Sequence, residues 1–383
     1  MKLPSYFNDF LAAIRPQDNH VEDYKTGHKT LRKRLQEFDE LSPLIVTTFL
    51  QGSYRRSTAI RPQGDKRADV DVIVVTKLSE EEYTPKTGMD LFVPFLEKFY
   101  KNKYEVQGRS FGIQLSYVDL DLVITSAPSE SEVGVLKSDS VSSDDTPETS
   151  RADDDWRLNQ LWISTEARSM LSLERQQYRL DSANKENEWK VSPLRIPDRD
   201  TQNWQDTHPL EQIRWTWDKN RRCNKHYVNV VKALKWWRRE NHTTPKYPKG
   251  YPVEHLIGEC CPDGIGSVAE GVTKTLEAIA YNYNAYAALK RTPNLPDRGV
   301  PSHNVFKRVS GEDFAEFHAQ ICEAAKIARQ ALDEEDLHRS VEYWQQIFGK
   351  RFPDAPPKRS DGSPSGGFSP RQGPSIVTGG RFA

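Results

Sequence analysis

Residues 68–76 of this chain read ADVDVIVVT: two aspartates separated by a valine, followed by an unbroken apolar run. β-Branched side chains pack well on a pleated surface, so the run predicts a buried strand over 70–76. In a strand, side chains two positions apart point to the same face. Asp69 and Asp71 are therefore expected side by side at the beginning of one strand of a β-sheet.

A turn suited to phosphate precedes this pair. Residues 45–51, IVTTFLQ, predict a strand that ends at Gly52. Glycine lets the backbone approach a phosphate and the Ser53 hydroxyl can hydrogen-bond one, so both residues are candidate nucleotide contacts. Arg55 and Arg56 follow. One of them is a candidate phosphate contact, and a surface position at a helix start is an equally good interpretation.

A third carboxylate is expected from a neighbouring strand. The alternation in residues 112–125, GIQLSYVDLDLVIT, predicts one strand that contains Asp119 and Asp121. Asp121 lies deeper in the apolar run and is the candidate, whereas Asp119 is expected in solvent or behind the site. Three carboxylates can hold two Mg²⁺ ions ~4 Å apart, as nucleotidyl and phosphoryl transfer require. A lone acid at a strand end is typical of a solvated rim, but the turn, the pair and the third acid together favour Asp69, Asp71 and Asp121 as catalytic metal ligands.

Composition limits the classes of function. The 383 residues include 54 basic and 55 acidic side chains, a formal net charge of −1, so a general coat for nucleic acid is not expected. The four cysteines form no C-x-x-C pair and the histidines show no ligand spacing, so no zinc site is expected. No signal peptide and no apolar stretch of membrane-spanning length is visible, which predicts a soluble, cytoplasmic protein.

The order of elements predicts an α+β fold, with a mixed-sheet lobe followed by a helical lobe and a cleft between them. We expect a catalytic lobe with N-terminal helices over 1–205, including a flexible acidic insertion near 128–155. A helical lobe over 206–349 and a disordered tail rich in proline and glycine over 350–383 follow. Helices are predicted over 4–40, 90–100, 212–241, 253–260, 267–289, 311–333 and 337–349.

Several stretches resemble one known family. They are QGSYRRSTAIRP, ADVDVIVVTKL and LSYVDLDLVIT around the carboxylates, and THPLEQIRW, VVKALKWW and KYPKGYPVEHLIG in the helical part. All resemble the bacterial cGAS/DncV-like nucleotidyltransferases of the DNA polymerase β-like superfamily. The likeness is greatest to the clade D enzymes of antiphage CBASS operons, and it covers nearly the whole chain.

The resemblance implies a fold like that of cGAS and oligoadenylate synthase, and the activity of a cyclic oligonucleotide synthase. Such an enzyme joins ATP and GTP through 3′–5′ bonds into a cyclic trinucleotide second messenger, such as cyclic AMP-AMP-GMP or cyclic tri-AMP. Two Mg²⁺ ions, with Mn²⁺ as a substitute, are the implied cofactors, and Asp121 is implied to help activate the acceptor 3′-hydroxyl. The alternatives are a linear oligoadenylate-type product, another nucleotidyl transfer, and a regulated scaffold with weak activity.

The resemblance also implies nucleotide contacts in the helical lobe. VKALKWW is similar to the helix that supplies a lysine to the triphosphate, with Lys235 favoured over Lys232. Tyr251 matches an aromatic residue that stacks on the donor base, and packing is its alternative role. Asp198, in RIPDRD, is a candidate for facing the acceptor nucleotide, with packing or loop capping as alternatives. The remaining basic residues of the long helix are expected on a solvated face: Arg221, Lys225 and Arg239.

Partners are implied in the same way. The tail ends TGGRFA, residues 378–383, and suits ligation by a ubiquitin-transfer-like accessory protein of the operon. Activation by a HORMA-domain protein is the alternative, and a downstream effector would be reached through the cyclic product. The chain lacks the zinc-bearing insertion of cGAS, so direct sensing of nucleic acid is not expected, and neither is a membrane partner.

Overall fold

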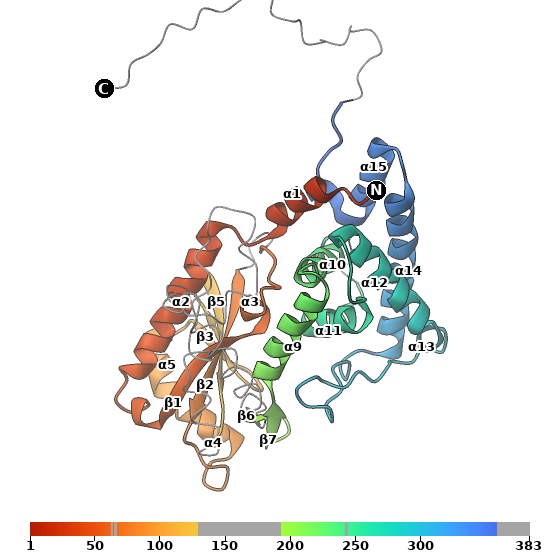
Figure 1. Cartoon of the computed structure of the whole chain (residues 1–383). Helices are drawn as coiled ribbons and strands as arrows, with labels where there is room; N and C mark the ends of the chain where they lie inside the picture. Colours follow the sequence, from red (N-terminus) through yellow and green to blue (C-terminus); the bar gives the residue numbers. More distant parts are fainter. Residues whose placement is uncertain (63, 65–66, 129–192, 242–243, 358–383) are drawn as a thin grey trace, which may run out of the picture.

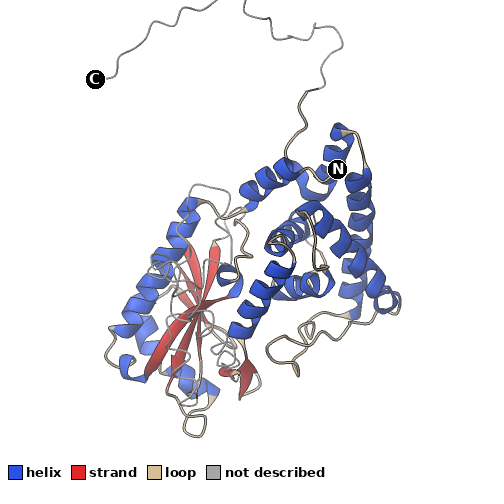
Figure 2. Ribbon diagram, in the orientation of Figure 1, coloured by secondary structure: helices blue, strands red, loops and turns tan. Residues whose placement is uncertain are grey.

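The computed structural model shows a sheet-containing half beside a helical half (Figure 1, Figure 2). The predicted α+β class, a mixed sheet followed by helices, is confirmed. The residues outside the described part of the chain are 63, 65–66, 129–192, 242–243 and 358–383. The predicted acidic insertion, from residue 129 on, and most of the predicted tail fall among them.

Five strands form a mixed sheet in the order β1-β2-β5-β4-β3. β2 runs antiparallel to β1 and parallel to β5, and β4 runs antiparallel to both β5 and β3. The parallel register sets Asp69 opposite Asp119, and Asp71 opposite Asp121. The strands are β1 Ile45–Gln51, β2 Ala68–Thr76, β3 Tyr104–Val106, β4 Phe111–Gln114 and β5 Val118–Ile124.

One face of this sheet is covered by helices of the same half. These include α2 (Asp18–Gln36) and α5 (Val93–Tyr100), which lie along the sheet in Figure 1. Even-numbered β2 residues such as Val72 pack there, in one buried core with Leu31 and Phe95. This core packs against β2 and β5, which are hydrogen-bonded neighbours in the sheet.

The opposite face of the sheet is turned toward the helical half. Ile73 packs on it with Leu210 of α9 (Pro209–Arg222), the first helix of that half. Side chains alternate along a strand, so Asp69 and Asp71 lie on this same face. The odd-even pattern of β2 therefore directs the carboxylate pair toward the helices.

Two predicted elements of the first half are too long, because the chain turns within them. The helix predicted over 4–40 is divided into α1 (Pro4–Ile14) and α2. Pro16 stands between them, and proline disfavours helical backbone in the residue before it. The strand predicted over 112–125 is divided into β4 and β5, where Leu115 closes a tight hydrogen-bonded turn.

The helix predicted over 212–241 is likewise two helices, α9 and α10 (Tyr227–Asn241). Asn224 and Lys225 between them have φ angles of 52° and 66°, which a right-handed helix cannot contain. A small antiparallel sheet that precedes α9 was not predicted. Its strands are β6 Leu194–Asp198 and β7 Asn203–Thr207.

The helical half is built around α10, whose Trp236 is buried in its core. The remaining helices of the chain are α3 Gly52–Arg55, α4 Pro85–Asp90, α11 Tyr251–Cys260, α12 Val268–Asn282, α13 Asn284–Ala288, α14 Gly311–Asp333 and α15 Leu337–Phe348, with short 3₁₀ turns η1 Ser42–Leu44 and η4 Gly349–Arg351. The predicted domain boundaries stay predictions. However, α1 packs in the helical core although it precedes the sheet, with Phe10 stacked on Phe348 at 4.5 Å.

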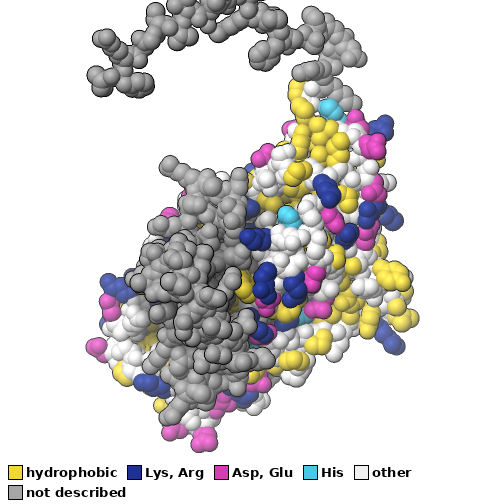
Figure 3. Space-filling model, in the orientation of Figure 1, with side chains coloured by type: hydrophobic (Ala, Val, Ile, Leu, Met, Phe, Trp, Pro, Cys, Tyr) yellow, Lys and Arg dark blue, Asp and Glu magenta, His cyan; other side chains and the backbone are white. Residues whose placement is uncertain are grey.

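The surface agrees with the near-neutral charge. Figure 3 shows acidic and basic side chains interspersed over the visible face of the helical half. That face is therefore not the basic coat typical of a general nucleic-acid binder. Among the described helices, none combines the length and the apolar character that crossing a membrane requires.

The aromatic cluster between α1 and α15 predicts a large loss of stability on truncation. Trp344 is fully buried, with its ring 4.9 Å from that of Phe7. Trp344→Ala is expected to lower the free energy of unfolding by about 3–5 kcal/mol, because it removes these contacts and leaves a cavity. Urea denaturation followed by circular dichroism measures the change. The control Tyr281→Ala removes a side chain that is 86% exposed and should change the value by less than about 0.5 kcal/mol. Equal losses for both variants would contradict the packing.

Candidate active site

Three carboxylates converge where β2 and β5 run in parallel. Asp69, Asp71 and Asp121 each offer an oxygen atom, and these atoms all lie within 4.8 Å of one another. The register explains the meeting, because Asp71 and Asp121 are direct cross-strand partners. Asp119 instead pairs with Arg67 at 3.1 Å, and its side chain is 38% exposed, as expected for a residue in solvent.

The electrostatics of the three groups favour a bound cation. Desolvation by the surrounding protein, with the charge of Asp71 second, raises the pKa of Asp69 to about 8. The same two causes raise the pKa of Asp121 to about 6. Burial also raises the pKa of Asp71, although the nearby Arg56 guanidinium opposes the rise. Asp69 stays accessible to solvent. An accessible set of three mutually repelling carboxylates fits a hard divalent cation.

The turn after β1 closes directly over this cluster. Gly52 has a φ of 73°, and a Cβ atom at this position would lie 1.8 Å from Oδ2 of Asp71. Both the backbone angle and the space therefore require glycine. The Ser53 carbonyl accepts a hydrogen bond from the Thr58 N–H at 2.9 Å, which folds the segment back on itself.

A buried ion cluster holds this turn against the helical half. Glu254 of α11 is 1% exposed and accepts hydrogen bonds from Arg56 Nε at 2.7 Å and from the Thr58 hydroxyl at 2.8 Å. Lys235 of α10 donates to the Thr58 carbonyl at 3.0 Å and lies 3.8 Å from Glu254. Burial alone would raise the pKa of Glu254, but Arg56 and Lys235 outweigh it and lower that pKa to about 2. The turn, α10 and α11 thus share one charge-balanced contact.

The two lysines predicted to reach a triphosphate lie in different places. Lys235 reaches the turn, close enough for Asp71 to affect its pKa. Lys232 is fully buried, and burial followed by the charge of Arg15 lowers its pKa far below the usual value. Its charged neighbours are Arg15 and Lys235 rather than the carboxylates. The geometry therefore favours Lys235 for contact with a nucleotide.

Tyr251 stands at the start of α11, beside the ion cluster. The Arg56 guanidinium lies 5.0 Å from the centre of its ring, and the ring of His255 packs edge-on at 5.7 Å. Gly250 before it has a φ of 63° and open space around its Cα. The ring of Tyr251 thus packs against Arg56 and His255, and the residue remains partly exposed. Base stacking stays a prediction.

The two arginines after the turn are not on the surface, and that interpretation is wrong. Arg55 is 4% exposed and burial lowers its pKa to about 10. Arg56 is 5% exposed and pairs with Glu254. Arg56 is covered by α11 through this pair with Glu254. A phosphate contact for either residue remains a prediction.

Asp198 makes the contacts of a loop cap. It is 3% exposed at the end of β6 and accepts hydrogen bonds from the backbone N–H groups of Asp200 and Thr201, both at 3.0 Å. Arg109 donates to its other oxygen at 2.7 Å. With both oxygens engaged, the capping interpretation describes this side chain better than a nucleotide contact does.

Glu254 is the residue that sequence reasoning missed. Its partner Arg56 lies 198 positions earlier, so no local pattern links them. The available signal was a lone acid in the apolar helix segment YPVEHLIG, three positions after Tyr251. A carboxylate on a buried helix face requires a cationic partner, and that requirement pointed to an unidentified contact.

Comparisons with known proteins agree with this geometry. Residues 1–128 match the family model of the Second Messenger Oligonucleotide or Dinucleotide Synthetase domain. The chain is 48% identical over 394 residues to a probable cyclic AMP-AMP-GMP nucleotide synthase of Salmonella paratyphi B, with all of both chains covered. It is 49% identical over 375 residues to the cyclic AMP-AMP-GMP synthase of Enterobacter hormaechei subsp. hoffmannii, with 96% of both covered.

A solved structure shows the same fold at low identity. The chain of CdnC from E. coli MS115-1, solved in complex with HORMA-deltaN, superposes with a TM-score of 0.59 at 16% identity. The match covers 92% of this chain and 99% of the other. Together with the full-length identity to two synthases, this places the chain in a family: it belongs to the cGAS/DncV-like nucleotidyltransferases, the bacterial second-messenger oligonucleotide synthetases.

Proposed function

We propose that this chain joins ATP and GTP through 3′–5′ bonds into a cyclic trinucleotide, cyclic AMP-AMP-GMP. The observation that carries the proposal is the meeting of Asp69, Asp71 and Asp121 beside the Gly-Ser turn, in a chain nearly half identical to two cyclic AMP-AMP-GMP synthases. Because the chain is more similar to these two synthases than to a cyclic AMP-AMP-AMP synthase, which is 29% identical, we prefer the mixed product to cyclic tri-AMP. Clade D membership, a role in antiphage defence and a cytoplasmic location belong to the same proposal.

The cofactor part of the proposal is a pair of Mg²⁺ ions, with Mn²⁺ as a substitute. Asp69, Asp71 and Asp121 would hold them, and their all-oxygen donor set and raised pKa values support that assignment. Bound there, the metal would polarise the donor phosphate and increase the acidity of the acceptor 3′-hydroxyl. The carboxylate of Asp121 would then orient that hydroxyl.

The nucleotide part of the proposal uses four residues. Gly52 and Ser53 contact the donor phosphates, Lys235 neutralises the triphosphate and Tyr251 stacks on the donor base. Support comes from the space that Gly52 leaves beside the carboxylates and from the fixed position of the Lys235 amine. A lysine suits a triphosphate because it is a compact charge on a long stem.

Four other candidates receive positioning roles or none. Arg56 is proposed to hold the turn through Glu254 rather than to bind phosphate, and Asp198 to shape the loop after β6. Lys232 and Arg55 are buried and are left out of the contact set.

Two accessory systems fit the chain as partners. Ligation of the C-terminal tail by a ubiquitin-transfer-like protein is supported by its composition, rich in proline and glycine. Activation by a HORMA-domain protein is the alternative. It is supported by the similarity of the fold to that of CdnC, which was solved in complex with HORMA-deltaN. The product would act through a separate effector.

Substitution of one carboxylate tests the catalytic site. Asp121→Asn is expected to reduce formation of product from ATP, GTP and Mg²⁺ by roughly 100-fold or more, because a charged metal ligand supplies several kcal/mol. Mass spectrometry of the reaction quantifies the product. Asp119→Asn is the matched control, on the same strand but paired with Arg67, and should keep activity within about threefold. Equal losses of activity for the two variants would contradict the assignment of Asp121 as a catalytic metal ligand.

The same reaction distinguishes a cyclic from a linear product. Phosphatase removes the terminal phosphates of a linear oligonucleotide, whereas a cycle has none to lose. We expect the product mass to be unchanged by phosphatase and to match a ring of two adenylates and one guanylate. A product that loses phosphate would contradict cyclisation and support the linear alternative.

The raised carboxylate pKa values predict proton release on metal binding. Near pH 7, Asp69 and in part Asp121 carry protons without a cation, since their pKa values are about 8 and about 6. A divalent cation requires the ionised forms, so its affinity should rise from pH 6 to pH 8. Calorimetric titration with Mn²⁺ in two buffers of different ionisation heat counts the protons released at pH 7. A count of zero, or an affinity that is flat with pH, would show that these groups do not bind the metal.

Removal of the Glu254 charge tests the link between the turn and the helical half. Glu254→Gln leaves Arg56 and Lys235 buried without their carboxylate, and is expected to cost about 3–5 kcal/mol of unfolding free energy. Glu259→Gln, on the same helix and 44% exposed, should cost less than about 1 kcal/mol. Urea titration compares the two. A stable Glu254→Gln protein with unchanged KM for ATP would contradict the positioning role.

A further inference from the structure

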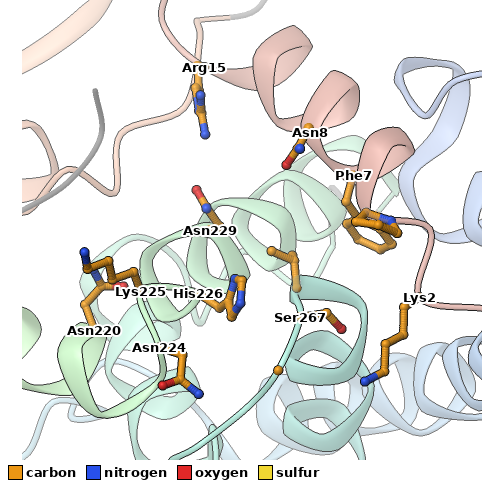
Figure 4. Close-up of a pocket in the computed structure, with 13 residues that line it drawn as sticks. Lys2, Phe7, Asn8, Arg15, Asn220, Asn224, Lys225, His226, Asn229 and Ser267 are labelled. Atoms are coloured by element: carbon orange, nitrogen blue, oxygen red, sulfur yellow. The ribbon is translucent and has the colours of Figure 1, made fainter. Parts of the chain in front are cut away.

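A cavity of about 260 Å³ lies apart from the carboxylates, in the helical half (Figure 4). Its walls are the N-terminal segment with α1, the turn between α9 and α10, and the start of α12. None of its lining residues belongs to the five-stranded sheet. A single water occupies about 30 Å³ of liquid, so the cavity has room for a small molecule rather than for one ordered water.

The lining of this cavity has basic side chains and no acid. Lys2, Arg15 and Lys225 contribute to it, and no aspartate or glutamate does. Glu270, outside the lining, partly balances Lys2 at 3.6 Å. Lys225 forms no ion pair with any residue in the described ranges. Arg15 also lies close to the buried Lys232.

Two amide side chains in the same cavity have unused hydrogen-bonding capacity. Asn220 is 3% exposed, and its Oδ1 accepts from the Val228 N–H at 3.1 Å. This bond fixes Nδ2 as the remaining donor, and no described residue accepts from it. The Oδ1 atom of Asn229 is buried and has no partner within the described part of the chain. An unsatisfied buried polar atom such as Asn229 Oδ1 is rare and costs about 1–3 kcal/mol, which points to a ligand or water at this place.

The arrangement of the charges indicates the kind of ligand. Figure 4 shows Arg15 at one end of the cavity, Lys2 at the other, and Asn229 and His226 between them. The chain places Lys225 in this wall through the left-handed turn at Asn224. The cavity also borders the first residue of α12, where helix N–H groups favour an anion. Cations at separate points suit an anion that carries more than one charge.

We propose that this cavity binds a small phosphate-bearing anion, at a site separate from the catalytic carboxylates. Lys225 and Arg15 pair with the phosphate oxygens, and the Asn220 amide donates to them. Asn229 orients the remainder of the ligand. The site joins the N-terminal segment to the start of α10, the helix that carries Lys235 two turns later. An anion bound here therefore contacts the same rigid element as the nucleotide site.

Pyrophosphate is the probe that tests this site. The full chain carrying Asp69→Asn and Asp71→Asn, with EDTA present, removes metal-dependent binding at the carboxylates. Calorimetric titration of this protein with pyrophosphate should give a Kd below about 1 mM, an affinity that a few charge-assisted hydrogen bonds provide. Lys225→Glu, added to this background, should weaken binding roughly tenfold or more, since one charged hydrogen bond supplies that factor.

A matched charge reversal controls for net charge. Lys326→Glu changes the charge equally but replaces a lysine of α14 that is 72% exposed and lies outside the cavity lining. It should leave the Kd within about twofold. Thermal unfolding of each variant confirms that the fold is kept. Absence of pyrophosphate binding, equal weakening by the two charge reversals, or citrate binding as tightly as pyrophosphate would each overturn the proposal.

Discussion

The buried carboxylate of Glu254 joins the two halves of the molecule, because its partners come from both of them. Taking such a charge out of water costs several kcal/mol unless cations and hydrogen bonds replace the solvent. Arg56, Lys235 and the Thr58 hydroxyl supply them, from the segment after β1 and from α10. No member of this set can move far without leaving another charge buried alone. The turn that begins at Gly52 is therefore held against the helical half by this buried ion cluster, and apolar contacts between the halves add to it.

Because of this ion cluster, the candidate site has carboxylates on one side and cations on the other. On the sheet side, the parallel register of β2 and β5 concentrates Asp71 and Asp121, and their repulsion calls for cations. Across from it, Lys235 of α10 and Arg56 of the turn after β1 are two cations that share the single carboxylate of Glu254. Gly52 separates the two sides with a backbone that has no side chain to fill the space. A metal-bound triphosphate, with its alternating charges, is complementary to this sequence of groups.

The sequence allowed the sheet side to be predicted well, because its determinants are local. The strand over 45–51 was predicted with the bounds that the structure shows, and the i, i+2 rule brought Asp69 and Asp71 to one face. The sequence led to wrong element bounds where a turn lies within a stretch whose hydrophobic pattern continues on both sides of the turn. The alternation around Leu115 hid the break between β4 and β5, and the apolar period of α9 and α10 hid their division. The hydrogen-bonded turn at Leu115 marks the first break, and the φ angles of Asn224 and Lys225 mark the second.

Long-range pairing set the other limit. Lys232 and Lys235 stand three positions apart on one helix and look interchangeable in the sequence. Their environments differ because Lys235 meets Glu254 and the Thr58 carbonyl, whereas Lys232 meets Arg15. The partners come from α11, from the turn after β1 and from the segment between α1 and α2, all distant along the chain. Burial lowers the pKa of both lysines, but for Lys235 the charge of Glu254 opposes the shift, whereas for Lys232 the charge of Arg15 adds to it. The chemistry of each lysine is thus assigned by the packing of the two halves, which is why the fold had to be known before one could be preferred.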